Sequence, residues 1–294
     1  MNNSLNKRQK GYFEGWYFKQ QDMDHTVAFI PAFHTDNKGY PAASLQIITD
    51  NFTYNFNFPA QMLHVNRKKF IIELGENIFS KYGCKINLES KECSAHGNIC
   101  FGPLLPPAYD IMGPFCFVPF MECRHSVFSV YHRVDGEVLI NGRNYYFENA
   151  AGYIEGDRGH SFPKGYIWTQ CSWNENSIMI SVAEIPFGLF KFVGSIGIIL
   201  FNGKEYRIAT YCGAKVIKIS NNFISLRQGS LILEIKLLYG KSFLLNAPQS
   251  GIMTRKVRES AACRVRYTCY SDNEVLFDFV SDRASFENNW QGAR

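Results

Sequence analysis

One short segment concentrates side chains that could exchange protons. Four titratable or charged residues lie within six positions, and two glycines stand among them: Glu155, Asp157, Arg158 and His160. A carboxylic acid or an imidazole in such a group can act as a general acid or base. Because glycine permits unusual backbone angles, Gly156 and Gly159 indicate a shaped loop between two halves of the chain rather than a strand. The structural alternative is a charged hinge in which Arg158 pairs with a neighbouring carboxylate.

Other common catalytic patterns are missing from the sequence. There is no G-x-S-x-G, no G-x-G-x-x-G, and Gly240, Lys241 and Ser242 lack the earlier glycine of a phosphate-binding loop. His125 and His132 are seven positions apart, so an extended strand would point them to opposite faces, and we expect no metal and no cofactor. Cys123 and His125 could form a nucleophile with its base, or could simply pack in a strand.

The elements that must position these groups are strands. Apolar and polar residues alternate with period two at residues 54–58 and 264–269. Asn-Gly pairs at 141–142 and 202–203, flanked by apolar residues, indicate hairpin turns. The best candidate for a helix is a short piece at residues 283–290. The fold class that follows is all-β, a sandwich or barrel system.

The chain also carries a weak internal echo. Residues 14–20 and 164–170 share the order glycine, ring, any residue, ring, any residue, glutamine, and start 150 positions apart. This offset indicates two successive β-barrels of similar plan, although two strands can also resemble each other by chance. Between them, residues 102–120 hold five prolines, which excludes a central strand and indicates an apolar loop or lid, or a plain crossover between strands.

Composition narrows the class of ligand. Of 294 residues, 15% are aromatic, more than two barrel cores need, so some rings should line a cavity for an apolar small molecule. A net charge of +5, spread over short clusters at residues 7–10, 67–69 and 255–258, is too small for a dedicated nucleic-acid binder. These clusters are typical of solvated turns, and they also permit contact with an anionic membrane surface.

The cysteines and the hydropathy indicate the compartment. The nine cysteines include no C-x-x-C pair, and an odd number in a large chain argues against a disulfide framework. The N-terminal residues show no signal peptide, and no stretch approaches the 18 or so apolar residues of a membrane-spanning helix. We therefore expect a cytoplasmic protein with reduced thiols.

Several motifs together resemble one known family. The sequence EGWYF at residues 14–18, the block at residues 153–170, and the stretch from 245–248 through 259–260 resemble the tocopherol cyclase-like family in order and spacing along nearly the whole chain. The EGWYF opening is also similar to a wider group of two-barrel, lipocalin-like proteins that includes carotenoid hydratases. The resemblance therefore implies two tandem antiparallel lipocalin-like β-barrels, which we place at residues 11–150 and 151–290, with an apolar cavity near their junction.

The resemblance also implies a reaction. Such a cyclase closes a chroman ring on a prenylated quinol: an acid protonates the prenyl double bond, and the neighbouring phenol oxygen captures the tertiary carbocation. The site needs a neutral carboxylic acid, aromatic rings and the exclusion of water. Glu155 matches the family's glutamate, Gly159 its glycine, residues 162–163 its Phe-Pro, and Trp168 and Gln170 its tryptophan and glutamine.

The chain departs from the family within the same block. Where the plant enzymes have Lys-Asn-Trp, this chain has Gly156, Asp157 and Arg158, so a guanidinium replaces a large ring. A guanidinium beside Asp157 would favour the charged carboxylate, which opposes proton donation, unless Arg158 turns away.

The expected site follows from the motifs and the resemblance. We assign Glu155 and Asp157 as catalytic residues, and expect the ligand to contact Glu14, Trp16, Phe18, Arg158, His160, Tyr166, Trp168 and Gln170. The function implied is chroman ring closure or a related acid-catalysed addition on an isoprenoid. The alternatives are a non-catalytic carrier of isoprenoid or acyl lipids and a scaffold with filled barrels. The expected partner is a hydrophobic small molecule, not a nucleic acid, with peripheral membrane contact as a further option.

The cysteine assignment gives a first prediction. Alkylation of the denatured, unreduced protein should label all nine cysteines, because thiols stay reduced in the cytoplasm. Mass spectrometry counts the added groups, and a sample reduced beforehand is the control. A pair of cysteines that is labelled only after reduction would contradict the expectation of a cytoplasmic protein.

Overall fold

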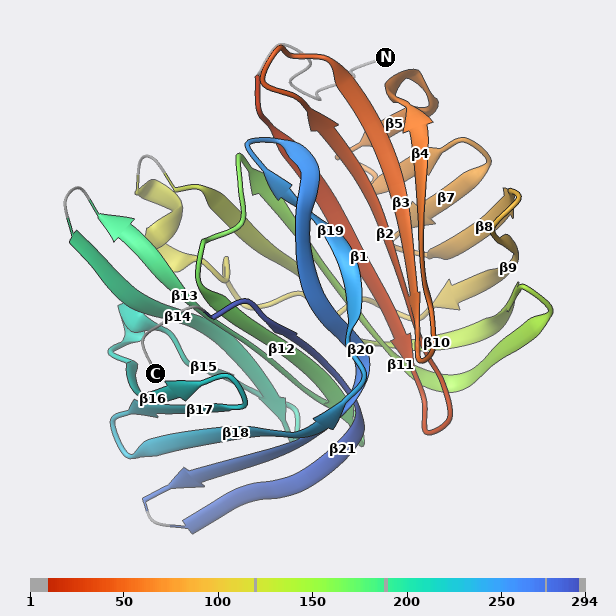
Figure 1. The fold of residues 1–294 in the computed structure, drawn as a ribbon. Coiled ribbons are helices and arrows are strands. Elements are labelled where there is room, and N and C mark those ends of the chain that lie inside the picture. Colours follow the sequence, from red (N-terminus) through yellow and green to blue (C-terminus); the bar gives the residue numbers. More distant parts are fainter. Residues whose placement is uncertain (1–9, 119–120, 188–189, 273, 291–294) are drawn as a thin grey trace. The chain divides into compact units, whose positions relative to one another are not determined.

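The computed structural model describes residues 10–118, 121–187, 190–272 and 274–290. Within these residues the chain forms 21 β-strands and three short 3-10 helices, and none of the described segments is an α-helix (Figure 1). The all-β prediction is therefore confirmed. The short helices are Ala60–Met62, Gly113–Phe117 and Thr210–Cys212.

The chain divides into two compact units. The first comprises residues 1–106, 122–162 and 245–256, and the second comprises residues 107–121, 163–244 and 257–294. The boundary expected between residues 150 and 151 falls inside a strand of the first unit, and the chain returns to that unit twice after first entering the second, at residues 122 and 245.

The first unit is built around one eleven-stranded antiparallel sheet. The strand order is β4-β3-β2-β1-β11-β10-β9-β8-β7-β6-β5, and the sheet curls into a nearly closed barrel (Figure 1). The strands are β1 (Phe13–Gln21), β2 (Thr26–Thr35), β3 (Pro41–Thr49), β4 (Thr53–Pro59), β5 (Leu63–Asn66), β6 (Ile71–Leu74), β7 (Asn77–Ser80), β8 (Gly83–Glu89), β9 (Ser94–Phe101), β10 (Cys123–Ile140) and β11 (Arg143–Gly159).

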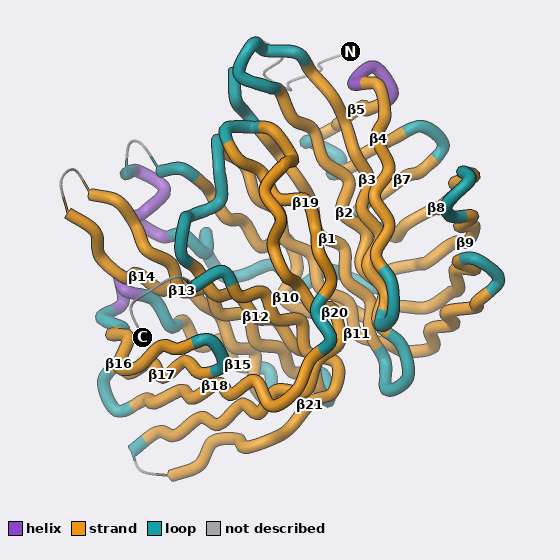
Figure 2. The backbone as a smooth tube through the Cα atoms, viewed as in Figure 1, coloured by secondary structure: helices purple, strands orange, loops and turns teal. Residues whose placement is uncertain are grey.

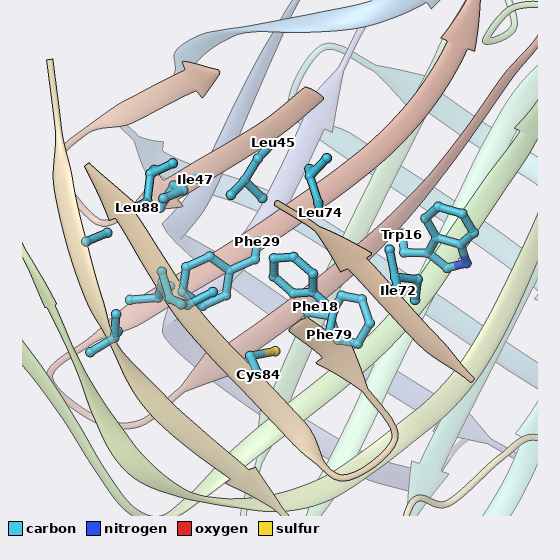
Figure 3. Packing of buried hydrophobic residues seen from close by; sticks show 14 of the residues in the cluster. Trp16, Phe18, Phe29, Leu45, Ile47, Ile72, Leu74, Phe79, Cys84 and Leu88 are labelled. Atoms are coloured by element: carbon cyan, nitrogen blue, oxygen red, sulfur yellow. The ribbon is translucent and has the colours of Figure 1, made fainter. Parts of the chain in front are cut away.

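Aromatic side chains fill the first barrel. Because successive residues of a strand point to opposite faces, β1 turns Trp16 and Phe18 inward. The ring of Phe18 lies 5.5 Å from that of Phe79, and Phe79 lies 6.1 Å from Phe29, measured between ring centroids (Figure 3). These pairs lie at the separations at which aromatic rings attract, so the surplus of rings in the sequence is used here as core.

The second unit contains another antiparallel sheet. Its main order is β15-β14-β13-β12-β21-β20-β18-β17-β16, with β19 paired to β20, and Figure 2 shows that strands make up most of the described part of this sheet. The strands are β12 (Tyr166–Trp173), β13 (Asn176–Phe187), β14 (Phe190–Phe201), β15 (Lys204–Arg207), β16 (Lys215–Ser220), β17 (Phe223–Gln228), β18 (Leu231–Gly240), β19 (Phe243–Gln249), β20 (Ile252–Ser271) and β21 (Glu274–Asn288). Most of β19 and the start of β20 belong to the first unit.

The turns follow the residues that predict them. Asn141 and Gly142 have φ of 48° and 77° and join β10 to β11, while Asn202 and Gly203, with φ of 50° and 72°, join β14 to β15. Positive φ at both central residues defines the type I′ turn, whose twist suits a hairpin. Both hairpin predictions are confirmed. The proline-rich segment at 102–118 forms no strand beyond a single bridge from Leu105 to Tyr131, and residues 119–120 lie outside the described part.

Two local predictions are wrong. Residues 149–159 are not a loop but the second half of β11, because they pair on both sides, with β1 and with β10. Gly156 lies in this strand opposite Trp16, and of these two glycines only Gly159, at the end of the strand, has a positive φ, of 154°. Where a helix was expected at 283–290, residues 283–288 form the end of β21, which pairs with β12 and β20. In both cases partners distant in sequence decide the local structure.

The two segments of the internal echo form equivalent strands of the two sheets, but they turn opposite sets of side chains toward the core. β1 pairs with β2 and β11, and β12 pairs with β13 and β21, so each echo strand lies beside the next strand and the last long strand of its sheet. In β1 the rings of Trp16 and Phe18 join the core, whereas in β12 Ile167 joins the core and Tyr166 and Trp168 face the other way. The echo therefore reflects topology and not a repeated core pattern.

Two further expectations concern thiols and membranes. All nine cysteines are free in the structure, as predicted. Among the described residues, no helix has both the length and the apolar character needed to cross a membrane.

The first core gives a stability prediction. Phe18→Ala should lower the free energy of unfolding by about 3–5 kcal/mol, because it removes a fully buried ring and leaves a cavity among three other rings. Urea denaturation followed by circular dichroism measures the change. Phe52→Ala is the matched control, since Phe52 is 54% exposed and should lose less than about 1 kcal/mol. Equal losses for both variants would contradict this core assignment.

Candidate proton-transfer site

The candidate site lies on three neighbouring strands of the first unit. In the register of β1, β11 and β10, Tyr17 is opposite Glu155, and Asp157 is opposite His125. Ile154 joins the barrel core, so Tyr153, Glu155 and Asp157 lie on the outer face of β11. The outer-face cluster, as we call it, consists of Cys123, His125, Tyr153, Glu155 and Asp157.

The members of the outer-face cluster form a continuous chain of polar contacts. The Tyr153 hydroxyl donates to Glu155 Oε2 at 2.6 Å, and His125 Nε2 lies 3.2 Å from the same oxygen. On its other side, His125 Nδ1 lies 3.0 Å from Asp157 Oδ1, which also accepts from the Cys123 thiol at 3.3 Å. The imidazole thus lies between two carboxylates. Its Nδ1 is in hydrogen-bond geometry with Asp157, whereas its Nε2 contacts Glu155 without the geometry of a hydrogen bond.

Burial and charge together determine where the proton resides. Burial by itself would lower the pKa of His125, but the charges of Asp157 and Glu155 and their hydrogen bonds raise it well above the usual range. Burial and Glu155 raise the pKa of the Tyr153 hydroxyl well above its usual value. His125 is therefore an imidazolium at neutral pH, and the proton of the cluster is stored on it.

The thiol of Cys123 is not set up as a nucleophile. Burial and the nearby Asp157 carboxylate raise the pKa of this thiol well above its usual value, which opposes formation of the reactive thiolate. The pairing of Cys123 with His125 as nucleophile and base is therefore unsupported, because both groups bind Asp157 instead of each other.

Three of these side chains could also hold a metal ion. The donor atoms of His125, Glu155 and Asp157 all lie within 4.8 Å of one another. The prediction that His125 and His132 face opposite ways is confirmed, since His132 is opposite Gly152 on the core side of β11. A metal would need His125 to release its proton, and so metal binding would compete directly with proton storage.

Arg158 lies on the opposite face from Asp157. It is opposite Glu14 in the register, on the face of β1 that carries Trp16. Glu14 itself receives two hydrogen bonds from Arg67, at 2.6 and 2.5 Å, and one from the Tyr12 hydroxyl at 3.2 Å. Burial and the Glu14 charge raise the pKa of Tyr12 to about 12. Adjacent strand residues alternate, so Arg158 turns away from the outer-face cluster.

The other expected ligand contacts are dispersed over both units. In the first unit, Trp16 and Phe18 pack in the core, and His160 Nδ1 lies 2.7 Å from the Gly11 carbonyl oxygen. In the second unit, the Tyr166 hydroxyl donates to Glu287 and the Gln170 amide donates to Ser172 Oγ at 3.1 Å. Trp168 is buried on the same face of β12 as Tyr166.

Reasoning from sequence missed the groups that complete the cluster. Tyr153 and Tyr17 lie on the same face as Glu155, whereas the motifs in the sequence indicate Trp16 and Phe18 as ligand contacts. His125 is about thirty residues before Glu155, so only the pairing of β10 with β11 brings them together. The sequence did contain one indication, the alternation of side chains along a strand. If residues 153–158 form a strand, Tyr153, Glu155 and Asp157 lie on one face and Arg158 lies on the other.

A second histidine of β10 is in the opposite electrostatic state. His132 is buried next to Phe101, whose ring centroid is 4.5 Å away, and burial lowers the pKa of His132 to about 3. Ser129 Oγ donates to the Tyr131 carbonyl, so it can only accept from His132 Nδ1, 3.0 Å away. His132 is therefore a neutral imidazole protonated at Nδ1.

Comparison with known proteins bears on the fold. No family model matches the chain, and no curated protein sequence matches it either. A candidate AttH protein from Nitrosomonas europaea is similar in structure, with a TM-score of 0.55 at 11% identity, over 95% of this chain and 92% of that one. Kievitone hydratase from Nectria haematococca has a TM-score of 0.51 at 8% identity, over 95% and 89%. The chain is thus an all-β protein of the lipocalin-like barrel class.

The two histidines give a prediction about pH. In a nuclear magnetic resonance titration, His125 should stay protonated well above pH 6.5, and His132 should stay neutral down to about pH 3. Because the folded-state pKa of His125 is raised, its contribution to stability is complete below about pH 6.5 and is lost as the pH rises through the folded value. For His132 the pKa is lowered, so its contribution is present above about pH 6.5 and is lost as the pH falls toward 3.

The resonances are assigned with His125→Gln and His132→Gln. Release of the His125 proton at or below pH 6.5 would contradict the placement of this imidazole between two carboxylates.

Proposed function

We propose that the chain catalyses an acid-promoted addition to a carbon–carbon double bond of an apolar molecule, of the tocopherol cyclase type. The substrate class is a prenylated quinol or another isoprenoid, and the reaction closes a chroman ring without redox change. The observation that carries the proposal is the buried chain of contacts from Asp157 through His125 to Glu155 and Tyr153. The motifs at residues 14–18 and 153–170, which resemble the cyclase-like family, support the same reaction.

The first step is loading of the acid. The resting cluster holds one imidazolium between two carboxylates, and the Asp157 side chain is 22% exposed. An apolar substrate over this opening removes water, which disfavours separated charges relative to neutral groups. The proton then moves from His125 Nε2 to Glu155 Oε2, 3.2 Å away. Glu155 becomes an un-ionised carboxylic acid, a stronger donor toward an alkene than the imidazolium.

The second step is the addition itself. Glu155 gives its proton to the less substituted alkene carbon, the π bond breaks, and a tertiary carbocation remains. The phenol oxygen of the substrate then forms a C–O bond to the cation, and the phenol proton leaves to His125, which restores the imidazolium. The number of atoms and the oxidation state of the substrate do not change, so the reaction is an isomerisation.

The outer face also offers groups that stabilise the cation. Tyr17 is opposite Glu155 in the register, and Tyr153 is two residues away on the same face of β11. Aromatic faces and the remaining carboxylate charge both attract a carbocation in a site with little water. Since Arg158 faces the other way, its positive charge does not oppose the cation directly.

Replacement of Glu155 tests the acid. Glu155→Gln should abolish turnover of a prenylated quinol, a loss of about a hundredfold or more, because the amide keeps the shape but cannot deliver a proton. Binding of the quinol should change little. Liquid chromatography of the chroman product measures turnover, and calorimetry measures binding. Glu148→Gln is the matched control, an exposed glutamate of the same strand that should keep full activity.

Replacement of Asp157 separates the roles of the two carboxylates. Asp157→Asn should lower kcat by about tenfold without abolishing it, since His125 loses one of the charges that hold its proton. Abolition by Asp157→Asn alone would make Asp157 the donor and would contradict the assignment of Glu155. Wild-type protein that binds prenyl lipids but converts no quinol would instead identify a non-catalytic carrier.

A further inference from the structure

The second unit contains a pocket far in sequence from the outer-face cluster. Its volume is about 270 Å³. The walls come from β18, β20, β21, the residues that follow β18 and β21, and the turn between β16 and β17. The lining residues are Asn221, Leu237, Gly240, Ser242, Arg258, Ser260, Cys263, Phe286, Asn288 and Trp290. Leu237, Cys263, Phe286 and Trp290 belong to or pack on the core of this barrel, so part of the pocket wall is apolar.

Backbone irregularities in β20 shape this pocket. Ser260 is opposite Phe286, which is part of the core, so Ser260 and Arg258 share the inward face of the strand. The register between β20 and β21 shifts between Ser260 and Cys263, which turns Cys263 to the same face. A regular strand would point positions 260 and 263 to opposite sides. Bulges of this kind often re-aim side chains next to binding sites.

A glycine of β18 leaves the space that the pocket needs. Gly240 is opposite Cys263, and a Cβ atom at Gly240 would lie 2.7 Å from Cys263 Cβ. No side chain fits at that position without moving β18 away from β20. The pocket wall is thus built from two strands in unusually close contact.

Two polar groups of the pocket point to a ligand. Ser260 as a whole residue is 4% exposed, and among the described residues its hydroxyl has no hydrogen-bond partner. A buried hydroxyl without a partner lowers the free energy of unfolding. A bound ligand that forms a hydrogen bond with this hydroxyl would remove that cost. Arg258, two residues earlier on the same strand, lines the pocket from its exposed side and forms no ion pair with any residue that the structure describes. An unpaired guanidinium next to a buried hydroxyl is suited to an anion.

We propose that this pocket binds a small monocarboxylate with an apolar body. The planar guanidinium of Arg258 matches a carboxylate in geometry and charge, and the Ser260 hydroxyl can donate to the same group. Leu237, Phe286 and Trp290 take the apolar part. The volume is just below the range of about 300–1,000 Å³ for drug-sized ligands, which favours a short acyl chain or a single ring. The site is independent of the proposed reaction.

Octanoate is the probe for this site. Calorimetry with the full-length protein should detect octanoate, and 1-octanol, which lacks the carboxylate, should bind at least about tenfold more weakly because it cannot pair with Arg258. Quenching of tryptophan fluorescence that is lost in Trp290→Phe should report the same event. Equal affinities for the acid and the alcohol, or no binding of octanoate at millimolar concentration, would overturn the proposal.

Single substitutions locate the carboxylate. Arg258→Gln should weaken octanoate binding by about tenfold to a hundredfold, the usual effect of losing a charged hydrogen-bond partner. Arg264→Gln is the matched control: this arginine is on the same strand, is exposed, and pairs with Asp282 at 3.7 Å outside the pocket. Equal effects of the two substitutions would mean a non-specific charge effect and would overturn the assignment.

Ser260→Ala separates a ligand contact from a structural role. Without ligand, the substitution should leave the unfolding midpoint unchanged or raise it, because it removes a buried hydroxyl that has no partner among the described residues. With octanoate, the affinity should fall several-fold. A lower midpoint without ligand, together with unchanged affinity, would assign Ser260 a structural role only and contradict the proposal.

Discussion

The architecture of the first barrel depends on the register of β11 between β1 and β10. A strand alternates between its two faces, so this register decides that Ile154 enters the core while Glu155 meets His125. A slip of one residue would exchange the two faces and bury two carboxylates among phenylalanine rings, at a cost of several kcal/mol for each charge. The polar contacts from Tyr153 to Asp157 can form in only one register, and they therefore favour this pairing of the strands.

In both units, irregular β-structure accompanies the candidate sites. Register shifts in β10 occur between Val127 and His132, starting two residues after the histidine that supplies the imidazole. Shifts in β20 occur between Ser260 and Val265, beside the pocket of the second unit. Regular pairing produces the rigid barrel walls, and bulges turn selected polar side chains toward places where a ligand can meet them. The same scaffold can thus hold a charged, proton-storing cluster in one unit and an anion-attracting pocket in the other.

Much of the fold could be predicted from the sequence because its signals are local. Period-two alternation at residues 54–58 and the two Asn-Gly turns act within a few residues, and both predictions hold. The strand at residues 149–159 was missed because its glycines and charges suit a loop, and only pairing with β1 and β10 makes it a strand. For the site, Glu155 and Asp157 were accessible from their spacing and from the family resemblance. Their link through His125 was not, since it depends on a register that no local pattern encodes.

The order of strands also has a consequence for the newly made chain. β1 is synthesised first and soon has β2 on one side, but its other edge pairs with β11, from Phe13 opposite Gly159 to Gln21 opposite Ala151. At a usual rate of about 5–20 residues per second, the ribosome needs on the order of ten seconds to supply that partner. Throughout this interval, a nascent chain exposes an aromatic strand edge with unpaired backbone groups. The segment EGWYF therefore keeps one strand edge without its native partner for most of the synthesis of the first unit.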